Sequence, residues 1–296
     1  MEINRAPIKP SHIVRRERRL KFRKRILIVF LTLVFLGGLI YSTHARFMRI
    51  ETITIEGNRV VDTREVNRLL EASIDGNMIF VFPKNNIFLV GTHSLENTIL
   101  RDFPRIEMVS ITKHFFHELK VSITERKGTY LWCGALLSND SQENTSCYFV
   151  DDAGYIFSPS PYFSGGAYFK FYGGLDTNEI ANPVGAYILE EDTFASLVHF
   201  TDQILTLGFE SEALEIEENG TYSILLSKNS DKQESNTKII FTKDNTLDDI
   251  YKNLVTALSS VDFKREVRDN RDRLLYIDLR FTNKIYYKFA PATASF

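Results

Sequence analysis

Residues 26–43 read ILIVFLTLVFLGGLIYST, a run of eighteen residues without a charged side chain. As an α-helix this run would be about 27 Å long, close to the roughly 30 Å thickness of the hydrocarbon core of a bilayer. A cleavable signal peptide shares the order of a basic and then an apolar segment, but its apolar part usually has about 7–15 residues. The run therefore predicts a single transmembrane helix that stays in the mature protein.

The segment before this run is strongly basic. Residues 1–25 contain ten Lys or Arg residues against two acids, a net charge of +8, and the remaining 271 residues carry −10. Positively charged flanks of a membrane helix stay in the cytoplasm. We therefore expect a cytoplasmic tail at 1–25 and an extracytoplasmic location for the chain from about residue 44 onward. A basic tail can also bind nucleic acid, but topology and the adjacent anionic lipid headgroups account for it, so no nucleic-acid partner is expected.

A small α+β module is predicted directly after the anchor, at residues 47–126. Ile53 and Ile55 alternate with threonines, which is typical of a strand, and Asp62 or Thr63 caps a short helix that ends at Gly76. The order strand, helix, helix, strand, strand places two helices on one face of a three-stranded sheet. Besides that first helix, the predicted elements are a strand at 47–55, a helix at 94–101, and strands at 106–113 and 119–125.

Residues 127–290 are predicted to form a larger mixed β domain with two helices, followed by a tail at 291–296. The two helices, at 190–207 and 246–260, carry apolar stripes at helical spacing. The stretch 158–174 is rich in Gly, Ser, Pro and aromatic residues, so we expect irregular or edge structure there. Strands are predicted at 147–151, 155–157, 213–217, 221–227, 238–242, 274–280 and 284–289, the last two forming a terminal hairpin.

Two cysteines, Cys133 and Cys147, enclose the polar stretch SNDSQENTS at 138–146. In an oxidising compartment a disulfide would close this loop and stabilise the fold by about 3 kcal/mol. Two free thiols are the alternative. A structural zinc site needs four ligands, and two thiols do not supply them.

No pattern of catalytic residues is present in the sequence. The chain lacks G-x-S-x-G, a Gly-rich phosphate loop with Lys, and H-E-x-x-H. His114 and His117 are close in sequence but have no third ligand beside them. The acidic clusters 190–192 and 248–249 lie at the starts of predicted helices, where negative charges interact favourably with the helix dipole. We therefore expect no enzyme activity, no cofactor, no metal site and no small-molecule substrate.

Four segments resemble the FtsQ/DivIB family of bacterial cell-division proteins. Together with the basic tail and single anchor, they cover nearly the whole chain in the family's order. The first two resemble its POTRA module, and the last two resemble hairpins of its β domain. The segments are IETITIEGNRVV (50–61), FPRIEMVSITKHFFHELKVSITER (103–126), YFVDDAGYIF (148–157) and YIDLRFTNKIYYKF (276–289). The insertion at 133–147 and the loop at 228–235 depart from the family pattern.

The resemblance implies a non-enzymatic divisome scaffold at the septum of the plasma (inner) membrane. Family members bind FtsB- and FtsL-like single-pass proteins outside the membrane, so such proteins and the lipid bilayer are the expected partners. A POTRA-type envelope transport or assembly adaptor is the alternative, and it would predict tandem modules or a β-barrel. A membrane-anchored cell-wall enzyme would need a nucleophile with a base or a carboxylate pair, for which the sequence has no pattern.

The last predicted strand is the candidate partner-binding site. An edge strand has unpaired backbone groups, and an extended partner segment can add to it as a further strand. Alternation places Ile285, Tyr287 and Phe289 on one face and Tyr286 on the other, and the sequence does not decide which face meets the partner. The alternative is that these aromatic residues only fill the core. The candidate residues are Phe281, Asn283, Ile285, Tyr286, Tyr287 and Phe289.

Overall fold

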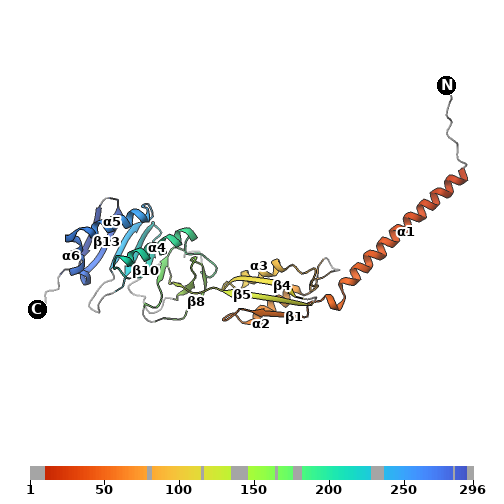
Figure 1. The fold of residues 1–296 in the computed structure, drawn as a ribbon, viewed down its shortest axis with the longest axis horizontal. Coiled ribbons are helices and arrows are strands. Elements are labelled where there is room, and N and C mark those ends of the chain that lie inside the picture. The colour runs from red at the N-terminus through yellow and green to blue at the C-terminus, as the bar shows by residue number, and fades with distance from the viewer. Residues whose placement is uncertain are drawn as a thin grey trace, which may run out of the picture. The chain divides into compact units, whose positions relative to one another are not determined.

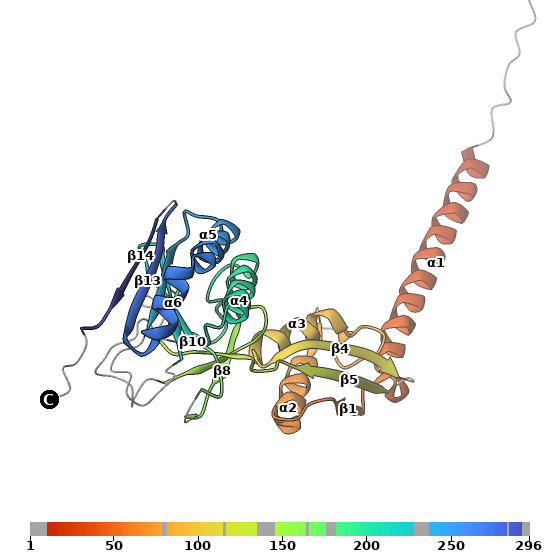
Figure 2. The ribbon, with the colours of Figure 1, turned by 60° about the vertical axis from the view of Figure 1, so that its left-hand side comes forward.

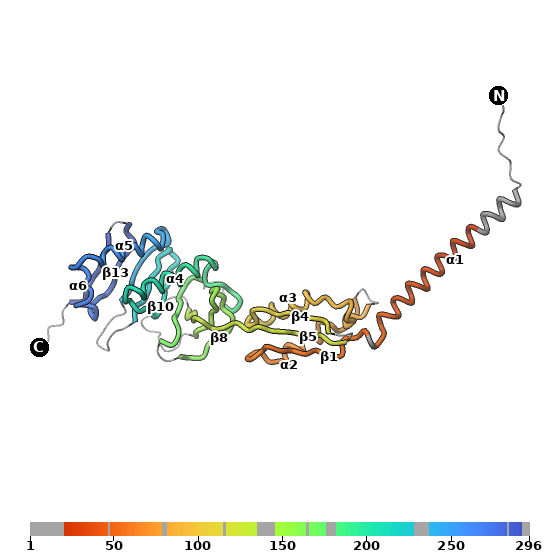
Figure 3. Tube along the Cα trace, viewed as in Figure 1, coloured from red at the N-terminus to blue at the C-terminus, as the bar shows by residue number. Residues whose placement is uncertain are grey.

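The computed structural model divides the chain into two compact units, Met1–Glu125 and Arg126–Phe296 (Figure 1). The path of the chain through their elements can be followed in Figure 3. The structure describes residues 11–78, 82–114, 117–134, 146–163, 166–175, 182–227, 237–282 and 284–291.

The first helix, α1 (Ser11–Thr43), contains both basic residues and the apolar run. Its part Lys21–Thr43 has a mean hydropathy of 2.3 and is the one helix in the described chain long and apolar enough to cross a membrane. The side chains of residues 21–39 are exposed on all sides of the helix. A helix that is apolar all round is stable when lipid or protein covers it, which agrees with the predicted membrane anchor.

The rest of the first unit has the predicted β-α-α-β-β order. Strand β5 is central in its three-stranded sheet, with β1 parallel to it on one side and β4 antiparallel on the other. The elements are η1 (Arg46–Met48), β1 (Thr52–Glu56), α2 (Thr63–Ile74), β2 (Asn77–Met78), β3 (Phe82–Pro83), α3 (Thr92–Asp102), β4 (Ile106–His114) and β5 (Glu118–Glu125).

One face of this sheet is covered by α2 and α3. Alternate residues of β5 are buried, as expected where one face meets the core and the other meets water. The core combines helix residues at i, i+4 spacing with inward strand residues. It includes Val66, Leu70 and Ile74 of α2, Leu95 and Ile99 of α3, Val109 and Ile111 of β4, and Leu119, Val121 and Ile123 of β5.

The turn after β1 is fixed by the end of β5. Gly57 has φ +90°, and a Cβ atom there would lie 2.2 Å from the carbonyl oxygen of Ile123, so only glycine fits. The Glu125 carboxylate accepts hydrogen bonds from the backbone N–H groups of Arg59, Val60 and Val61 at 2.6, 2.9 and 3.0 Å. Burial raises the pKa of Glu125, but these three hydrogen bonds and the charge of Arg105 outweigh it, and the pKa lies below its ordinary value.

The second unit is a nine-stranded sheet with helices on one face (Figure 2). Its strand order is β14-β13-β12-β11-β10-β9-β6-β7-β8, so β14 and β8 are the edges. The strands are β6 (Tyr130–Trp132), β7 (Tyr148–Val150), β8 (Ile156–Pro159), β9 (Lys170–Gly173), β10 (Ser211–Ile216), β11 (Thr221–Leu226), β12 (Lys238–Thr242), β13 (Leu274–Phe281) and β14 (Lys284–Phe289).

The helices of this unit contribute apolar side chains to a single core. It holds four fully buried phenylalanines, Phe171, Phe194, Phe200 and Phe241, and Phe200 and Phe241 contact edge to face with ring centroids 5.0 Å apart. Such aromatic pairs stabilise a core beyond the area they bury. The helices are α4 (Glu191–Thr206), α5 (Leu247–Ser259) and α6 (Val261–Asp269), followed by the short η2 (Arg271–Arg273).

Three expectations from the sequence need correction. The strand expected from residue 47 begins at Thr52, because residues 46–48 form the 3₁₀ turn η1. The stretch 158–174, expected to be irregular or edge structure, contains β9, which lies inside the sheet between β6 and β10. The second unit has a third helix, α6, which was not predicted; it begins directly after Ser260, and its apolar contacts, Phe263 and Val267, are only one helical turn apart.

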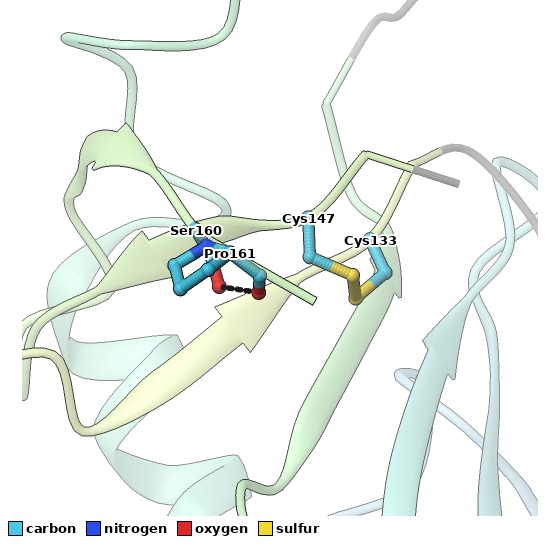
Figure 4. Close-up of a disulfide and its surroundings, with 4 residues drawn as sticks. All are labelled: Cys133, Cys147, Ser160 and Pro161. Carbon is cyan, nitrogen blue, oxygen red and sulfur yellow. Dashed lines mark hydrogen bonds between the residues drawn. A yellow bond between two sulfur atoms is a disulfide. The ribbon is translucent and has the colours of Figure 1, made fainter. Parts of the chain in front are cut away.

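A disulfide joins Cys133 and Cys147 (Figure 4). The two residues follow β6 and precede β7, which are antiparallel neighbours with Trp132 opposite Tyr148. The disulfide therefore closes the loop between two adjacent strands, and residues 135–145 of that loop lie outside the described residues. The backbone N–H of Ser160 donates to the Cys147 carbonyl at 2.9 Å, which links the end of β8 to the same place.

Replacing Glu125 with glutamine is expected to destabilise the first unit by about 1–2 kcal/mol at pH 7, because a neutral amide oxygen accepts the three backbone hydrogen bonds more weakly than the carboxylate does. The pKa of Glu125 is lower in the folded than in the unfolded chain, so the carboxylate stabilises the fold at pH values above its unfolded pKa. This stabilisation is lost as the pH falls through the folded pKa. The difference between E125Q and the native chain should therefore shrink below about pH 4.5. This difference is measured as the free energy of opening, from amide hydrogen exchange of residues 57–70 in the full chain.

The matched control is Glu107→Gln, which changes an exposed side chain on β4 of the same unit. It should leave the free energy of opening unchanged within about 0.5 kcal/mol. An E125Q effect that is equal at pH 7 and pH 4 would contradict the proposed role of the carboxylate charge.

Candidate functional site

The last strand, β14, is an edge of the nine-stranded sheet. It pairs antiparallel with β13, and among the described residues no strand pairs with its other side. Half of its backbone N–H and C=O groups therefore point away from the sheet, where water or another strand can bind them. Asn283, a candidate from the sequence, lies outside the described residues.

Three β14 side chains lie on the helix-covered face of the sheet. Ile285 and Phe289 are half-buried against the core. The Tyr287 ring contacts Phe263 of α6 edge to face at 4.8 Å between centroids, and its hydroxyl donates to Glu266 Oε2 at 2.8 Å. This hydrogen bond, with burial and the Glu266 charge, raises the pKa of Tyr287. Tyr287 therefore holds β14 against α6.

The opposite face of β14 presents an exposed aromatic pair. Tyr286 is 47% exposed, and Phe281, at the end of β13, is 50% exposed. Their ring centroids are 5.1 Å apart in an edge-to-face arrangement. Lys284 and Lys288 are exposed on the same strand and, by alternation, share the face of Tyr286. The structure thus separates the candidate residues into an outer pair, Phe281 and Tyr286, and an inner set, Ile285, Tyr287 and Phe289.

An ion pair between a buried carboxylate and an exposed guanidinium lies on β13, next to β14. Asp278 is opposite Tyr286 in the β13–β14 register and is buried. Arg280 binds its carboxylate through two nitrogens, Nε to Oδ1 at 2.9 Å and Nη2 to Oδ2 at 2.7 Å. Burial raises the pKa of Asp278, but the hydrogen bonds and charge of Arg280 outweigh it, and the pKa lies below its ordinary value. This pair fixes the outer surface of β13 beside the aromatic pair.

Both ends of the β13–β14 hairpin are held by contacts that the sequence analysis did not identify. Asn253 of α5 donates to the Thr282 carbonyl at 2.9 Å, and Asn245 donates to the Arg280 carbonyl at 3.1 Å. At the other end, the Ala290 N–H donates to the Arg273 carbonyl at 2.7 Å. Side-chain amides that bond a distant backbone have no local signature in a sequence, because the partner is set by tertiary packing.

The comparison with protein families concerns the first unit. Residues 48–126 match the family model described as a POTRA domain, FtsQ-type. This range begins within η1 and ends one residue after β5, and the observed element order is the one that such a module needs. Residues 48–126 are an FtsQ-type POTRA domain.

The POTRA domain confirms the resemblance to the FtsQ/DivIB family and supports a role as a cell-division scaffold. Division proteins with an FtsQ-type POTRA domain are known to be non-enzymatic. No curated protein matches the chain. Among the described residues, no group of three or more His, Cys, Asp or Glu side chains is placed to hold a metal ion.

The two neighbouring tyrosines of β14 should differ in their effect on stability. Tyr287→Phe removes the hydrogen bond to Glu266 and is expected to lower the free energy of unfolding by about 0.5–1 kcal/mol. Tyr286→Phe changes an exposed hydroxyl and should stay within about 0.5 kcal/mol of the native chain. Fluorescence of Trp132, the only tryptophan, reports denaturant unfolding of this unit in the full chain. Equal effects of the two variants would contradict the assigned faces.

Proposed function

We propose that this protein is a cell-division scaffold whose β14 edge binds an extended segment of a small FtsB- or FtsL-like single-pass protein. The FtsQ-type POTRA domain supports the division role. The proposed binding site rests on one observation: β14 is an edge strand of the sheet, and Tyr286 and Phe281 are exposed on the outer face of the β13–β14 hairpin. Backbone hydrogen bonds give such a complex its affinity, and the side chains on alternate positions give it specificity.

The outer face of the strand indicates the chemistry of the partner segment. Along β14 this face carries Lys284, Tyr286 and Lys288, with Phe281 beside Tyr286. A segment that alternates apolar and acidic residues complements this pattern, since the apolar residues would contact the two rings and the acids would lie near the lysines. Exposed aromatic side chains are also the residues that most often dominate binding energy at interfaces.

The distribution of charge supports the topology we propose. The ten basic residues of 1–25 precede the apolar part of α1, and this order supports a cytoplasmic tail with both folded units outside the cytoplasm. In this topology β14 belongs to the extracytoplasmic part of a single-pass protein at the septum. It can then meet the extracytoplasmic segments of other single-pass proteins.

The proposal predicts a partner contact at Tyr286. A photoreactive phenylalanine at position 286 of the full chain in cells should crosslink to one small single-pass protein. Tyr286→Glu should weaken binding of that purified protein by at least about tenfold, because it places a charge in the apolar centre of the contact. The affinity is measured with the full chain in lipid nanodiscs.

The matched control is Leu205→Glu, which changes another exposed apolar residue of the same unit, on α4. This variant should bind the partner as the native chain does. If both variants bind with native affinity, or if a photoreactive phenylalanine crosslinks the partner from position 205 and not from position 286, the β14 site is wrong.

A further inference from the structure

A loop of the POTRA domain is attached to the end of the membrane helix. Asn86 is 1% exposed, and its Nδ2 donates to the backbone carbonyl of Thr43, the last residue of α1, at 2.8 Å. Its Oδ1 accepts the backbone N–H of Phe88 at 2.9 Å. The last carbonyls of a helix have no donor within the helix, so the Asn86 amide satisfies one of them. One side chain therefore fixes both the helix end and the loop.

Backbone hydrogen bonds hold the same loop along the segment that leaves the helix. The N–H of Ile87 donates to the Met48 carbonyl at 2.8 Å, and the N–H of Ile50 donates to the Asn85 carbonyl at 2.8 Å. Arg49 and Asn86 form an isolated β-bridge between them. The position of the loop is therefore set relative to the C-terminal end of α1 within the first unit.

The loop exposes large apolar side chains at this place. Phe88 is 59% exposed and Leu89 is 37% exposed, whereas Ile87 and Val90 on either side are buried in the POTRA core. Burying Ile87 and Val90 would be enough to attach the loop to its own domain. An aromatic and an aliphatic side chain are therefore both exposed in this loop, two and three residues after Asn86.

The distance to the membrane boundary is short. The polar layer on each side of a bilayer is about 5–8 Å thick. Phe88 follows Asn86 by two residues, so its Cα lies within about 7 Å of the Asn86 Cα. Because Asn86 contacts the last residue of the membrane helix, Phe88 is within reach of the boundary between headgroups and acyl chains.

Exposed basic side chains lie in the same loop and in the segment that leaves the helix. Arg46 and Arg49, just after the helix, and Lys84, in the loop, are all exposed. Anionic lipid headgroups attract such side chains, and aromatic residues are enriched at the same depth. Exposed apolar residues with exposed arginine and lysine close to them in the chain are typical of a membrane-contacting segment.

We propose that Phe88 and Leu89 insert into the lipid leaflet that adjoins the POTRA domain, with Arg46, Arg49 and Lys84 on its headgroups. The domain would then be bound to the bilayer at two points, the helix end and this loop. Such a second contact holds the POTRA domain at the membrane surface. The proposal depends on α1 spanning the membrane and is independent of partner binding at β14.

The test uses a fluorescent label in full-length protein in lipid nanodiscs. Phe88→Cys and, separately, Leu89→Cys introduce one free thiol for an environment-sensitive nitrobenzoxadiazole dye, since Cys133 and Cys147 form a disulfide and do not react. Val60→Cys is the control, because Val60 is 66% exposed and lies beyond the other end of β1. Strand β1 alone separates the two ends by about 13 Å.

Doxyl-labelled phosphatidylcholine should quench dyes at positions 88 and 89 at least about threefold more than the dye at position 60. Replacing part of the neutral lipid by phosphatidylglycerol should strengthen the quenching at 88 and 89 if the three basic residues contact headgroups. Equal quenching at all three positions would overturn the proposal. The proposal would also be overturned if the dye at position 88 became shielded from water only after a second copy or another membrane protein was added, because a protein would then cover this surface.

Discussion

An open β-sheet ends in two edge strands, and the outward backbone groups of each edge must bond to water, to side chains or to another strand. The second unit has nine strands in one open sheet, so the constraint falls on β8 and β14. Among the described residues, β14 has one strand neighbour, β13. The exposed lysines on β14 are the kind of residue that discourages random edge pairing. Together with Tyr286 and Phe281 they would favour one complementary segment over others.

The one-sided placement of the helices gives β14 its two different faces. Tyr287 packs on helix α6 through a ring contact with Phe263 and a hydrogen bond to Glu266. This face of the strand therefore contributes to the stability of the folded unit. The other side has no helix among the described residues of the second unit, and Tyr286 remains exposed there. A rigid strand with one face anchored loses little conformational freedom when it binds, which favours affinity. The POTRA domain has a comparable division, since α2 and α3 cover one face of its sheet and leave the other polar.

Much of this architecture could be predicted from the sequence, for physical reasons that also explain the failures. The uncharged run at 26–43 and the alternation in residues 50–61 and 119–125 are local signals, and the helices and strands they predict are present. Helix α6 was missed because it has nine residues and follows α5 directly, so periodicity had little length in which to appear. The inner and outer faces of β14 could not be assigned, since alternation defines two faces without saying which one meets the core. The roles of Asn253 and Asn86 depend on backbone carbonyls far away in the chain, at Thr282 and Thr43, and only the folded structure brings them together.

The most direct measurement of the central claim is amide hydrogen exchange of β14 in the full chain, with and without the single-pass partner captured at position 286. Strand addition predicts that backbone amides within 284–289 become protected in the complex, while those of the other edge strand, β8, exchange as before. Side-chain contact without strand addition would leave the outward amides of β14 exchanging at their free rate. That result, or protection confined to the POTRA domain, would contradict the account.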